Sequence, residues 1–379
     1  MDKLLTVTVD GEVLKFPFVW LRDNCLCEQC FHPTAKSRVY WSDLHLKIKP
    51  KEITEGKDSI QVTWEDGHKS NFEYNWLKIR NFTPESQRKY DEVIYKPTKI
   101  TWHGEEFNDI CSKHDYNQIV KTDEALYNWL YKLSVYGVAI VKNTPNSENA
   151  IDAIIDRVAF IKRSHYGVKF VVQHISNTNN LAYLSNNLQM HTDLPYYEYG
   201  PGINILHCFV QTVSKGGENL LVDGHYIAKY IKKNHPEEYK LLTEVDIEWN
   251  DMGTEDGREF FKLYRAPIIT LDKYGEVQRI NFSVPQRSSH FLTPIENIEP
   301  WYRAYSLFLQ LCHKFAGKFK SEQGDILVFD NIRLIHSRNG YVDNENNVRK
   351  LIGAYIDWDE IYCKLRCLTM KLGYNKGFN

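Results

Sequence analysis

Residues 325–358 read DILVFDNIRLIHSRNGYVDNENNVRKLIGAYIDW, and this stretch decides the fold. Apolar residues fill both of its ends, whereas Asn339, Gly340 and the polar run DNENN at 343–347 interrupt the middle. This pattern is typical of two β-strands joined by a polar loop. His336 is then expected at the end of the first strand, and Arg349 at the start of the second. The sequence thus predicts a β domain that presents chemically active side chains at its strand ends.

Outward from this stretch, helices and short strands alternate without an internal repeat. Thr122 is expected to cap a helix that ends near Gly137, and Ser147 is expected to open a second helix. A third helix has Pro300 in its first turn and Gly317 at its end. Residues 361–372 form a last amphipathic helix. Strands separated by long connections, with helices beside them, predict an α+β, mainly β fold: a double-stranded β-helix (jelly roll) with helical buttresses over residues 100–379.

The N-terminal part predicts a separate small β domain over residues 1–80. The stretches LLTVTVD, VYWSDLHLKI and SIQVTWED alternate apolar and polar residues with a period of two, as strands with one buried face do. Glu65–Gly67 supplies a turn directly before His68. The polar stretch 81–99, which contains two prolines, is interpreted as a linker between the two domains.

Composition and charge argue against two classes of binding partner, nucleic acids and membranes. The 379 residues carry a formal net charge of -2, and no block of five basic residues occurs, which argues against a nucleic-acid surface. No run of 18 apolar residues exists, so no membrane partner is expected. The first residues lack the apolar segment of a secretory signal and are too acidic for a transit peptide, which favours a cytoplasmic location. A charged small molecule is the expected ligand.

The segment QMHTDLP at 189–195 holds the candidate metal ligands His191 and Asp193. Two positions apart in a strand, both side chains point to one face, as two ligands of one metal ion require. The spacing alone is weak evidence for a metal site, because residues 103–105 and 235–237 show the same His-x-acid pattern. The downstream His336 strengthens it: two histidines and a carboxylate on a β scaffold are the facial triad of non-haem Fe(II) oxygenases.

Arg349 and Tyr355 complete the predicted site. A guanidinium group can bind the far carboxylate of 2-oxoglutarate through two parallel hydrogen bonds. In VRKLIGAYIDW the residues at 349, 351, 353 and 355 share one face, so the strand that presents Arg349 to the metal also presents Tyr355. The alternatives are a zinc-binding cupin and a jelly roll with a merely buried histidine.

A second cluster, NCLCEQCFH at 24–32, places three of the eight cysteines within six positions. A disulfide, a metal site and a coincidence of small buried residues can each explain it. The expected reducing compartment argues against the disulfide. The other five cysteines lie scattered among apolar residues and are expected in the core.

The motifs together resemble one known family. WLRDNCLCEQC, LAYLSNNLQMHTDLP, PGINILHC, LLVDG, QRINF, FDNIRLIHSR and RKLIGAYIDWD occur in the order found in the γ-butyrobetaine/trimethyllysine hydroxylase family of Fe(II)- and 2-oxoglutarate-dependent dioxygenases. The resemblance runs from about residue 19 to residue 366. It implies hydroxylation of γ-butyrobetaine to L-carnitine, coupled to oxidative decarboxylation of 2-oxoglutarate to succinate and CO₂. Trimethyllysine hydroxylation is the rival activity. A non-catalytic module that binds quaternary ammonium groups is the alternative from another class.

The resemblance also assigns residues within this sequence. It makes His191, Asp193 and His336 the iron ligands and Arg349 the 2-oxoglutarate anchor. Leu206 would offer a backbone group near this cosubstrate, and Asn180 would lie between cosubstrate and substrate. An aromatic cage for the quaternary ammonium group, which attracts the cation to ring faces, maps to four residues, and a further substrate contact maps to one more: Tyr166, Phe170, Tyr183 and Tyr355, then Asn281. Phe170 departs from the tryptophan that the family leads us to expect.

For the cysteine cluster, the resemblance implies a structural zinc ion bound by Cys25, Cys27, Cys30 and His68. Three cysteines and one histidine form a closed tetrahedral site that suits structure rather than catalysis. His32 is a rival ligand, although it lies so close to Cys30 in sequence that it would cross-link little. The family further implies O₂ as a substrate, ascorbate to maintain Fe(II), and a homodimer.

Overall fold

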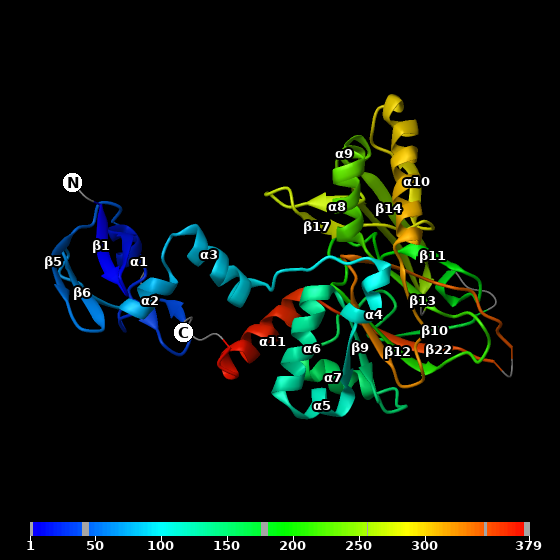
Figure 1. Ribbon diagram of the computed structural model, residues 1–379, viewed down its shortest axis with the longest axis horizontal. Helices are drawn as coiled ribbons and strands as arrows, with labels where there is room; N and C mark the ends of the chain where they lie inside the picture. Colours follow the sequence, from blue (N-terminus) through cyan, green and yellow to red (C-terminus); the bar gives the residue numbers. More distant parts are fainter. Residues whose placement is uncertain (1–2, 40–44, 176–180, 256, 345–346, 375–379) are drawn as a thin grey trace. The chain divides into compact units, whose positions relative to one another are not determined.

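The computed structural model describes residues 3–39, 45–175, 181–255, 257–344 and 347–374. It divides into two units: Met1–Pro97 together with Thr369–Asn379, and Thr98–Leu368. Each unit has its own core, and Figure 1 labels several elements of each unit.

The small unit is built from short antiparallel sheets. Alternation buries every second residue of the first strand, among them Leu5, Val7 and Val9. The strand β6 (Ser59–Trp64) buries Ile60, Val62 and Trp64 in the same way, and these side chains pack with those of the first strand in one hydrophobic core. The elements are β1 (Leu4–Val9) paired with β2 (Glu12–Pro17), α1 (Phe18–Asp23), β3 (Phe31–His32) paired with β4 (Ser37–Arg38), the sheet β5 (Pro50–Glu55), β6 (Ser59–Trp64) and β7 (Lys69–Glu73), and α2 (Tyr74–Ile79).

One expectation for this part of the chain needs correction, and the structure adds detail to a second. Of the strand expected in VYWSDLHLKI, residues 40–44 lie outside the described residues and 45–48 form no strand; the pairing strand is β5, which begins at Pro50. The stretch 81–99, expected to be a linker, contains the helix α3 (Pro84–Tyr90) and the short π-helix η1 (Asp91–Tyr95). The side chain of Thr83 accepts a hydrogen bond from the Ser86 N–H, and Pro84 occupies the first helical position, so local capping starts a helix that buries none of its residues.

A mixed six-stranded sheet forms one layer of the large unit. Its order is β10 (Phe170–Gln173), β22 (Lys350–Ile356), β12 (Ile203–Val210), β20 (Ile326–Asp330), β9 (Val138–Lys142) and β8 (Ser112–Asp115). Neighbours are antiparallel except for β8 and β9, which are parallel. The central strands β12, β20 and β22 are buried almost throughout, which explains their nearly continuous apolar sequences.

A four-stranded antiparallel sheet forms the second layer, in the order β11 (Leu188–His191), β21 (Leu334–Arg338), β13 (Asn219–Asp223) and β19 (Gly317–Phe319). The sequence predicted one strand from residue 325 to His336, and this is wrong. The stretch makes two strands, β20 and β21, that belong to different sheets, and the chain crosses between them at 331–333. The physical reason is a polar turn: the Asn331 side chain bonds to backbone groups of Asp193 and Pro201 instead of continuing the ladder.

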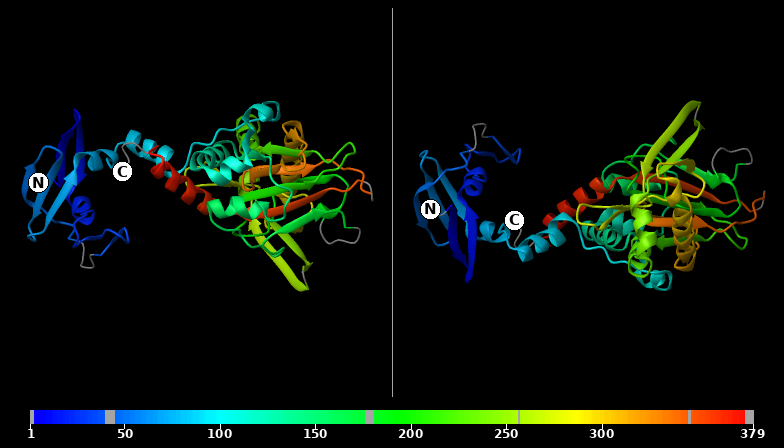
Figure 2. Two further views of the ribbon diagram at one scale, coloured as in Figure 1. Left: turned by 90° about the horizontal axis from the view of Figure 1, so that it is seen from below. Right: turned by 90° about the horizontal axis from the view of Figure 1, so that it is seen from above.

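A third sheet and a group of helices lie beside these layers. The hairpin of β14 (Ile247–Glu255) and β15 (Arg258–Ala266) pairs with β18 (Arg287–Phe291), and Figure 2 shows this hairpin (yellow-green) projecting from the side of the unit. Helices α8 (Gly224–Asn234), α9 (Pro236–Glu244) and α10 (Ile298–Lys314) pack together next to it (Figure 1). The remaining elements are β16 (Ile269–Leu271) paired with β17 (Val277–Ile280), the short turns η2 (Gly104–Glu106), η3 (Leu181–Tyr183) and η4 (Ile295–Asn297), and α4 (Phe107–Ile110).

The helices follow their sequence signals closely. Helix α6 (Asp123–Tyr136) is capped by Thr122 and ends at Gly137, whose positive φ of 77° suits a residue without a side chain. Helix α7 (Ala150–Val158) begins three residues after the expected Ser147, and α5 (Tyr116–Lys121) precedes α6. In α11 (Trp358–Lys371), Cys363 and Cys367 are exposed, so the expectation that they lie in the core is wrong. Among the described residues, no helix is long and apolar enough to cross a membrane.

A buried ion pair fixes the turn between β20 and β21. Arg333 donates to both carboxylate oxygens of Asp223, at 3.0 and 2.8 Å, and to the carbonyls of Ile100 and Val135. Both charged side chains are fully buried.

We predict that Arg333→Met lowers the free energy of unfolding by about 3–5 kcal/mol, because it leaves the Asp223 carboxylate buried without its partner. Urea unfolding followed by fluorescence measures the loss. Arg303→Met is the matched control, since Arg303 pairs with Glu299 on the exposed face of α10. Equal losses of unfolding free energy in the two variants would show that the buried ion pair stabilises the fold no more than an exposed one.

Candidate metal centres and active-site cavity

A cavity of about 260 Å³ opens between the sheets of the large unit, with space for small molecules but not for a folded partner. Its lining combines the expected metal ligands, two arginines and several aromatic rings. The residues of interest are His191, Asp193, Leu194, Asn204, Leu206, Asp251, His336, Arg338 and Arg349, together with the rings of Tyr166, Phe170, Tyr183, Tyr196 and Tyr355.

The three expected iron ligands converge at this cavity. His191 ends β11 and lies directly opposite His336 of β21 in the antiparallel register, with ring centroids 4.1 Å apart. Asp193 lies just beyond β11, and its Oδ1 is 3.3 Å from His191 Nε2 and 3.5 Å from His336 Nε2. Two donors about 2.1 Å from one ion and at right angles are separated by about 3 Å, so this donor set fits a single divalent ion.

The Asp193 carboxylate is held from two sides. Its other oxygen, Oδ2, accepts hydrogen bonds from Asn204 Nδ2 at 2.5 Å and from the Tyr355 hydroxyl at 2.9 Å. Asn204 and Tyr355 are direct cross-strand neighbours on β12 and β22. The side chain of Asn331 binds both the N–H and the carbonyl of Asp193. These donors satisfy Oδ2 and the backbone, which leaves Oδ1 facing the two histidines.

Protonation states favour metal binding at neutral pH. Burial alone would raise the pKa of Asp193, but His336, His191 and the Tyr355 hydroxyl lower it to about 2. Burial, together with the proximity of His191, lowers the pKa of His336 to about 3. His191 Nδ1 lies 2.8 Å from the Gln189 carbonyl, which fits an N–H donor there and leaves Nε2 free as a ligand. An ionised carboxylate and neutral imidazoles are the forms that bind a metal ion.

The chain is strained directly after the carboxylate. Leu194 has a positive φ of 54° and precedes Pro195, although a bulky side chain disfavours this left-handed conformation. Leu194 lines the cavity, so the sharp turn places an apolar group beside the ligands. The strain is retained because Asn331 fixes the preceding residue.

Arg349 fits the role of an anion anchor. It is 1% exposed, its Nε has no hydrogen-bond partner among the described residues, and Nη2 reaches only Asn219 Oδ1, at 3.5 Å. Burial and the nearby charge of Arg338 lower the pKa of Arg349 to about 10. A buried guanidinium with unused donors is suited to a carboxylate ligand such as that of 2-oxoglutarate.

All four expected cage residues line the cavity. The rings of Tyr166 and Phe170 have centroids 6.4 Å apart, and Phe170 stacks on Tyr355 at 4.9 Å. Phe170 pairs with Gly353 across the sheet, where an added Cβ would lie 2.2 Å from the Phe170 ring. The absence of a side chain at Gly353 therefore leaves the space that the Phe170 ring occupies.

Three other expected contacts have different outcomes. Leu206 lines the cavity, but it pairs on both sides, with Leu327 and Gly353, so its backbone contact to a cosubstrate stays a prediction. Asn281 is fully buried and does not line the cavity; its Nδ2 donates to the Pro195 carbonyl, and its substrate contact stays a prediction. Asn180 lies outside the described residues.

Sequence reasoning missed two residues that line the cavity and one that supports it from outside. Asn204 precedes Leu206 by two positions in the same strand, so strand alternation offered a signal for it. Asp251 belongs to β14 and reaches the cavity from the third sheet, and no local pattern marked it. Asn331 acts through tertiary hydrogen bonds that a single sequence does not reveal.

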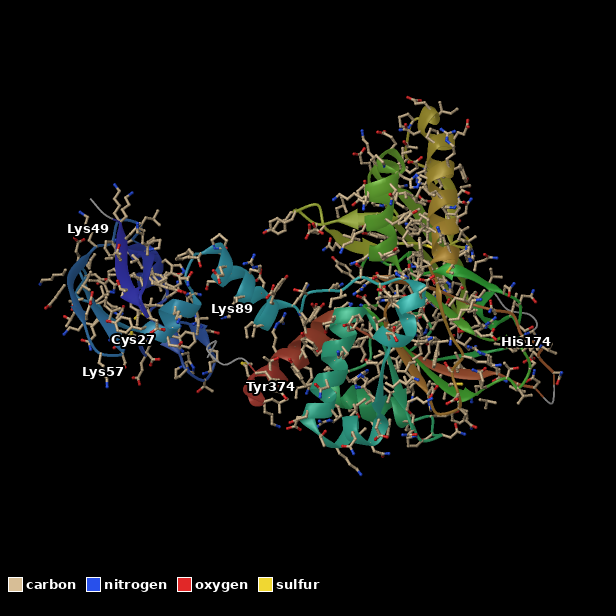
Figure 3. The ribbon with its side chains drawn as sticks, viewed as in Figure 1. Cys27, Lys49, Lys57, Lys89, His174 and Tyr374 are labelled. Atoms are coloured by element: carbon tan, nitrogen blue, oxygen red, sulfur yellow. The ribbon has the colours of Figure 1, made fainter. Side chains whose placement is uncertain are left out.

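The second ligand cluster lies in the small unit, where Figure 3 labels Cys27. The Nε2 of His68 is 3.3 Å from Cys25 Sγ, 3.5 Å from Cys27 Sγ and 3.6 Å from Cys30 Sγ. Zinc bonds of about 2.3 Å to sulfur and 2.0 Å to nitrogen in a tetrahedron separate such atoms by about 3.6 Å. The donor set therefore fits a zinc ion, whereas His32 is not part of the cluster.

Neighbouring groups hold this cluster in place. Arg22 donates to Cys30 Sγ at 3.5 Å and to Asp66 Oδ2 at 3.3 Å. The other oxygen of Asp66 accepts the backbone N–H of His68 at 2.9 Å. A nearby positive charge stabilises thiolate ligands, so Arg22 complements the negative charge that three thiolates bring.

Comparison with known proteins agrees with this geometry. Residues 98–355 match the family described as "Taurine catabolism dioxygenase TauD, TfdA family", and residues 1–78 match "Gamma-butyrobetaine hydroxylase-like, N-terminal". The chain is 33% identical to human gamma-butyrobetaine dioxygenase over 366 residues, covering 96% of this chain and 93% of the human protein.

Two further relatives show the range of similarity. Gamma-butyrobetaine dioxygenase of Pseudomonas sp. (strain AK-1) is 30% identical over 365 residues, covering 95% of this chain and 92% of that protein. Human mitochondrial trimethyllysine dioxygenase is 26% identical over 364 residues, covering 95% of this chain and 84% of that protein.

We predict that Cys27→Ser loses bound zinc and destabilises the small unit, because the binding energy of structural zinc is part of its folding energy. Metal analysis and thermal unfolding measure the two effects. Cys363→Ser, which alters an exposed thiol of α11, should change neither. A native protein without zinc, or a Cys27→Ser variant with full zinc content, would contradict the Cys₃His site.

We predict that Tyr355→Phe weakens metal binding by about tenfold while keeping the ring, because it removes one hydrogen bond to the Asp193 carboxylate. Anaerobic titration of the metal-free protein with Fe(II) or Co(II) measures the affinity. Tyr196→Phe removes a hydroxyl from the same cavity that does not bond to Asp193, and should leave metal affinity unchanged. Unchanged affinity in Tyr355→Phe would show that Asn204 alone suffices.

Proposed function

The chain belongs to the TauD/TfdA family of dioxygenases and to its γ-butyrobetaine dioxygenase branch, and we propose that it hydroxylates γ-butyrobetaine to L-carnitine. It is an Fe(II)- and 2-oxoglutarate-dependent dioxygenase. Under the proposal, hydroxylation is coupled to conversion of 2-oxoglutarate and O₂ to succinate and CO₂.

A single observation supports the proposal most strongly: one small cavity contains the metal ligands, the buried Arg349 and a group of aromatic rings. The metal ligands and arginine suit the cosubstrate. The rings suit a trimethylammonium group, which has no N–H donor and is therefore recognised through ring faces and methyl contacts rather than hydrogen bonds.

Each cavity residue then has a defined task. His191, Asp193 and His336 would hold Fe(II), which supplies the oxidising chemistry once cosubstrate and O₂ are present. Tyr355 and Asn204 donate to Oδ2 of Asp193, so that Oδ1 faces the two histidines and would be free to bind the metal ion. Arg349 would bind the far carboxylate of 2-oxoglutarate through its paired N–H groups. Leu194 and Leu206 add apolar side chains to the cavity lining and would help to exclude water from it.

The aromatic residues position the reacting carbon. Tyr166, Phe170, Tyr183 and Tyr355 would enclose the trimethylammonium group at one end of the substrate. Because Tyr355 also bonds to Asp193, the ring that touches the cation is fixed relative to the metal. Substrate position and metal geometry thus share one side chain, which favours reaction at a single carbon.

The finer structural assignments are part of the same proposal. The six-stranded and four-stranded sheets, which face the cavity with β22 and β12 on one side and β11 and β21 on the other, support a jelly-roll core. The catalytic domain would comprise residues 100–379, preceded by a zinc-binding domain at 1–80 and a connecting segment at 81–99. A cytoplasmic location, a homodimer and the use of ascorbate stay predictions.

Trimethyllysine hydroxylation is the second candidate, and one observation favours it. Trimethyllysine carries an α-ammonium group that needs an acidic partner, and Asp251 is a carboxylate in the cavity. The similarity to trimethyllysine dioxygenase is lower, however, at 26% against 33% for the human relatives.

We predict that γ-butyrobetaine stimulates decarboxylation of 2-oxoglutarate and that trimethyllysine does so only weakly. Release of CO₂ from labelled 2-oxoglutarate, together with mass analysis of the hydroxylated product, measures both activities. The His336→Ala variant is the control for metal-dependent turnover, because it removes a ligand at the cavity. The reverse ranking would overturn the butyrobetaine assignment while leaving the dioxygenase assignment intact.

A further inference from the structure

Asp251 is a cavity carboxylate without a cationic partner. It lies on β14, lines the cavity together with the metal ligands, and is half-buried. No ion pair within 4 Å involves it among the described residues. Lys262, its cross-strand neighbour on β15, instead places its amine over the ring of Tyr197, 5.2 Å from the centroid.

The immediate surroundings of Asp251 are aromatic. Its charge is close enough to the hydroxyls of Tyr196 and Tyr166 to raise the pKa of both, after the larger effect of burial. Burial also raises the pKa of the Asp251 carboxyl above its ordinary value, as expected for an anion that lacks a compensating charge. The Tyr196 hydroxyl, in turn, is close enough to the Asp251 carboxylate to oppose the effect of burial on its pKa.

The other charges of the cavity are committed elsewhere. Asp193 faces the two metal-binding histidines. Arg338 donates to the carbonyls of Ala182, Leu184 and Asn186, and Arg349 is the proposed anchor for 2-oxoglutarate. Among the charged cavity residues that the structure describes, Asp251 alone has no assigned partner, and its charge acts on Tyr166, which belongs to the expected cage.

We propose that Asp251 is the anionic side of the cation site: its carboxylate, together with the rings of Tyr166 and Tyr196, provides the counter-charge for the quaternary ammonium group of the substrate. The site thus takes a cation by two means, attraction to ring faces and a direct charge that needs no hydrogen bond. This extends the site beyond the residues that the sequence indicated and makes β14 a part of substrate selection. The inference rests on the proposed function only in taking the substrate to be a quaternary ammonium compound.

The position of Asp251 distinguishes two possible partners. A carboxylate for the α-ammonium group of trimethyllysine would lie at the end of the substrate remote from the cage. Asp251 instead adjoins Tyr166 and Tyr196, so the quaternary nitrogen is the closer cation. A quaternary nitrogen cannot donate a hydrogen bond, which agrees with a carboxylate that acts by charge through neighbouring rings.

The experiment separates the effect of a ligand's charge from the effect of its shape. It uses the holoenzyme with Fe(II) and 2-oxoglutarate under anaerobic conditions. Binding is measured for γ-butyrobetaine, for its neutral isostere with a tert-butyl carbon in place of nitrogen, and for tetramethylammonium. Asp251→Asn keeps the size and polarity of the side chain but removes its charge. We expect this variant to bind both cations about tenfold more weakly and the isostere with unchanged affinity.

Two controls separate the loss of the Asp251 charge from other causes of weaker binding. One tests whether any lost negative charge on the hairpin has the same effect, and the other tests whether the cavity is intact. Glu259→Gln removes one negative charge from an exposed position of β15 and should change none of the three affinities. Unchanged affinity of Asp251→Asn for 2-oxoglutarate shows that the rest of the cavity is intact. If Asp251→Asn weakens cation and isostere equally, or neither, the carboxylate does not act as a counter-charge and the inference is overturned.

A further comparison keeps this inference apart from the proposed function. If γ-butyrobetaine is not hydroxylated but tetramethylammonium binding still depends on Asp251, the cation site stands and the substrate assignment falls. If γ-butyrobetaine is hydroxylated and Asp251→Asn weakens only the binding of trimethyllysine, the carboxylate binds an α-ammonium group and the inference falls.

Discussion

The buried carboxylate of Asp193 is the constraint on which the catalytic unit depends. An ionised carboxylate removed from water is costly unless donors or a metal surround it. Here the donors come from separate parts of the chain: Asn204 on β12, Tyr355 on β22, and Asn331 at the crossing between β20 and β21. The two sheets must therefore be assembled in register before this charge can be buried. The same donors direct the remaining oxygen toward His191 and His336, so the requirement of the fold and the requirement of metal binding coincide.

The aromatic and acidic residues of the cavity come from different layers of the fold. Phe170 and Tyr355 belong to the six-stranded sheet, and their stacking depends on Gly353, which leaves space for the ring. Asp251 comes from a different sheet, on the hairpin of β14 and β15. Under the proposed function, substrate recognition is shared by two layers, of which only one also contains groups that bond to the Asp193 carboxylate. Changes in the hairpin can alter affinity for the substrate while the metal ligands stay unchanged.

Sequence reasoning was strongest where chemistry and strand alternation act locally. The face shared by Arg349, Leu351 and Tyr355 follows from the period of a strand, and all three line the cavity. The Cys25, Cys27, Cys30 and His68 cluster followed from resemblance, and its atoms converge as tetrahedral coordination requires. The crossing at Asn331 was missed because the polar residues at 330, 331 and 333 were taken as part of one strand, although such residues between apolar stretches can mark a turn. Asp251 was missed because only tertiary packing brings the hairpin to the cavity.

The pairing of His191 with His336 has a consequence for how the protein is made. These histidines face each other in register although 145 positions separate them in the chain. Contacts between such distant residues form late in folding, because a long loop must close first. During synthesis, an emerging chain that lacks β21 therefore offers iron only one histidine and one carboxylate. Complete coordination of iron would therefore wait until the surrounding cavity exists, so the register of two strands would protect the unfinished polypeptide from oxidative damage by its own cofactor.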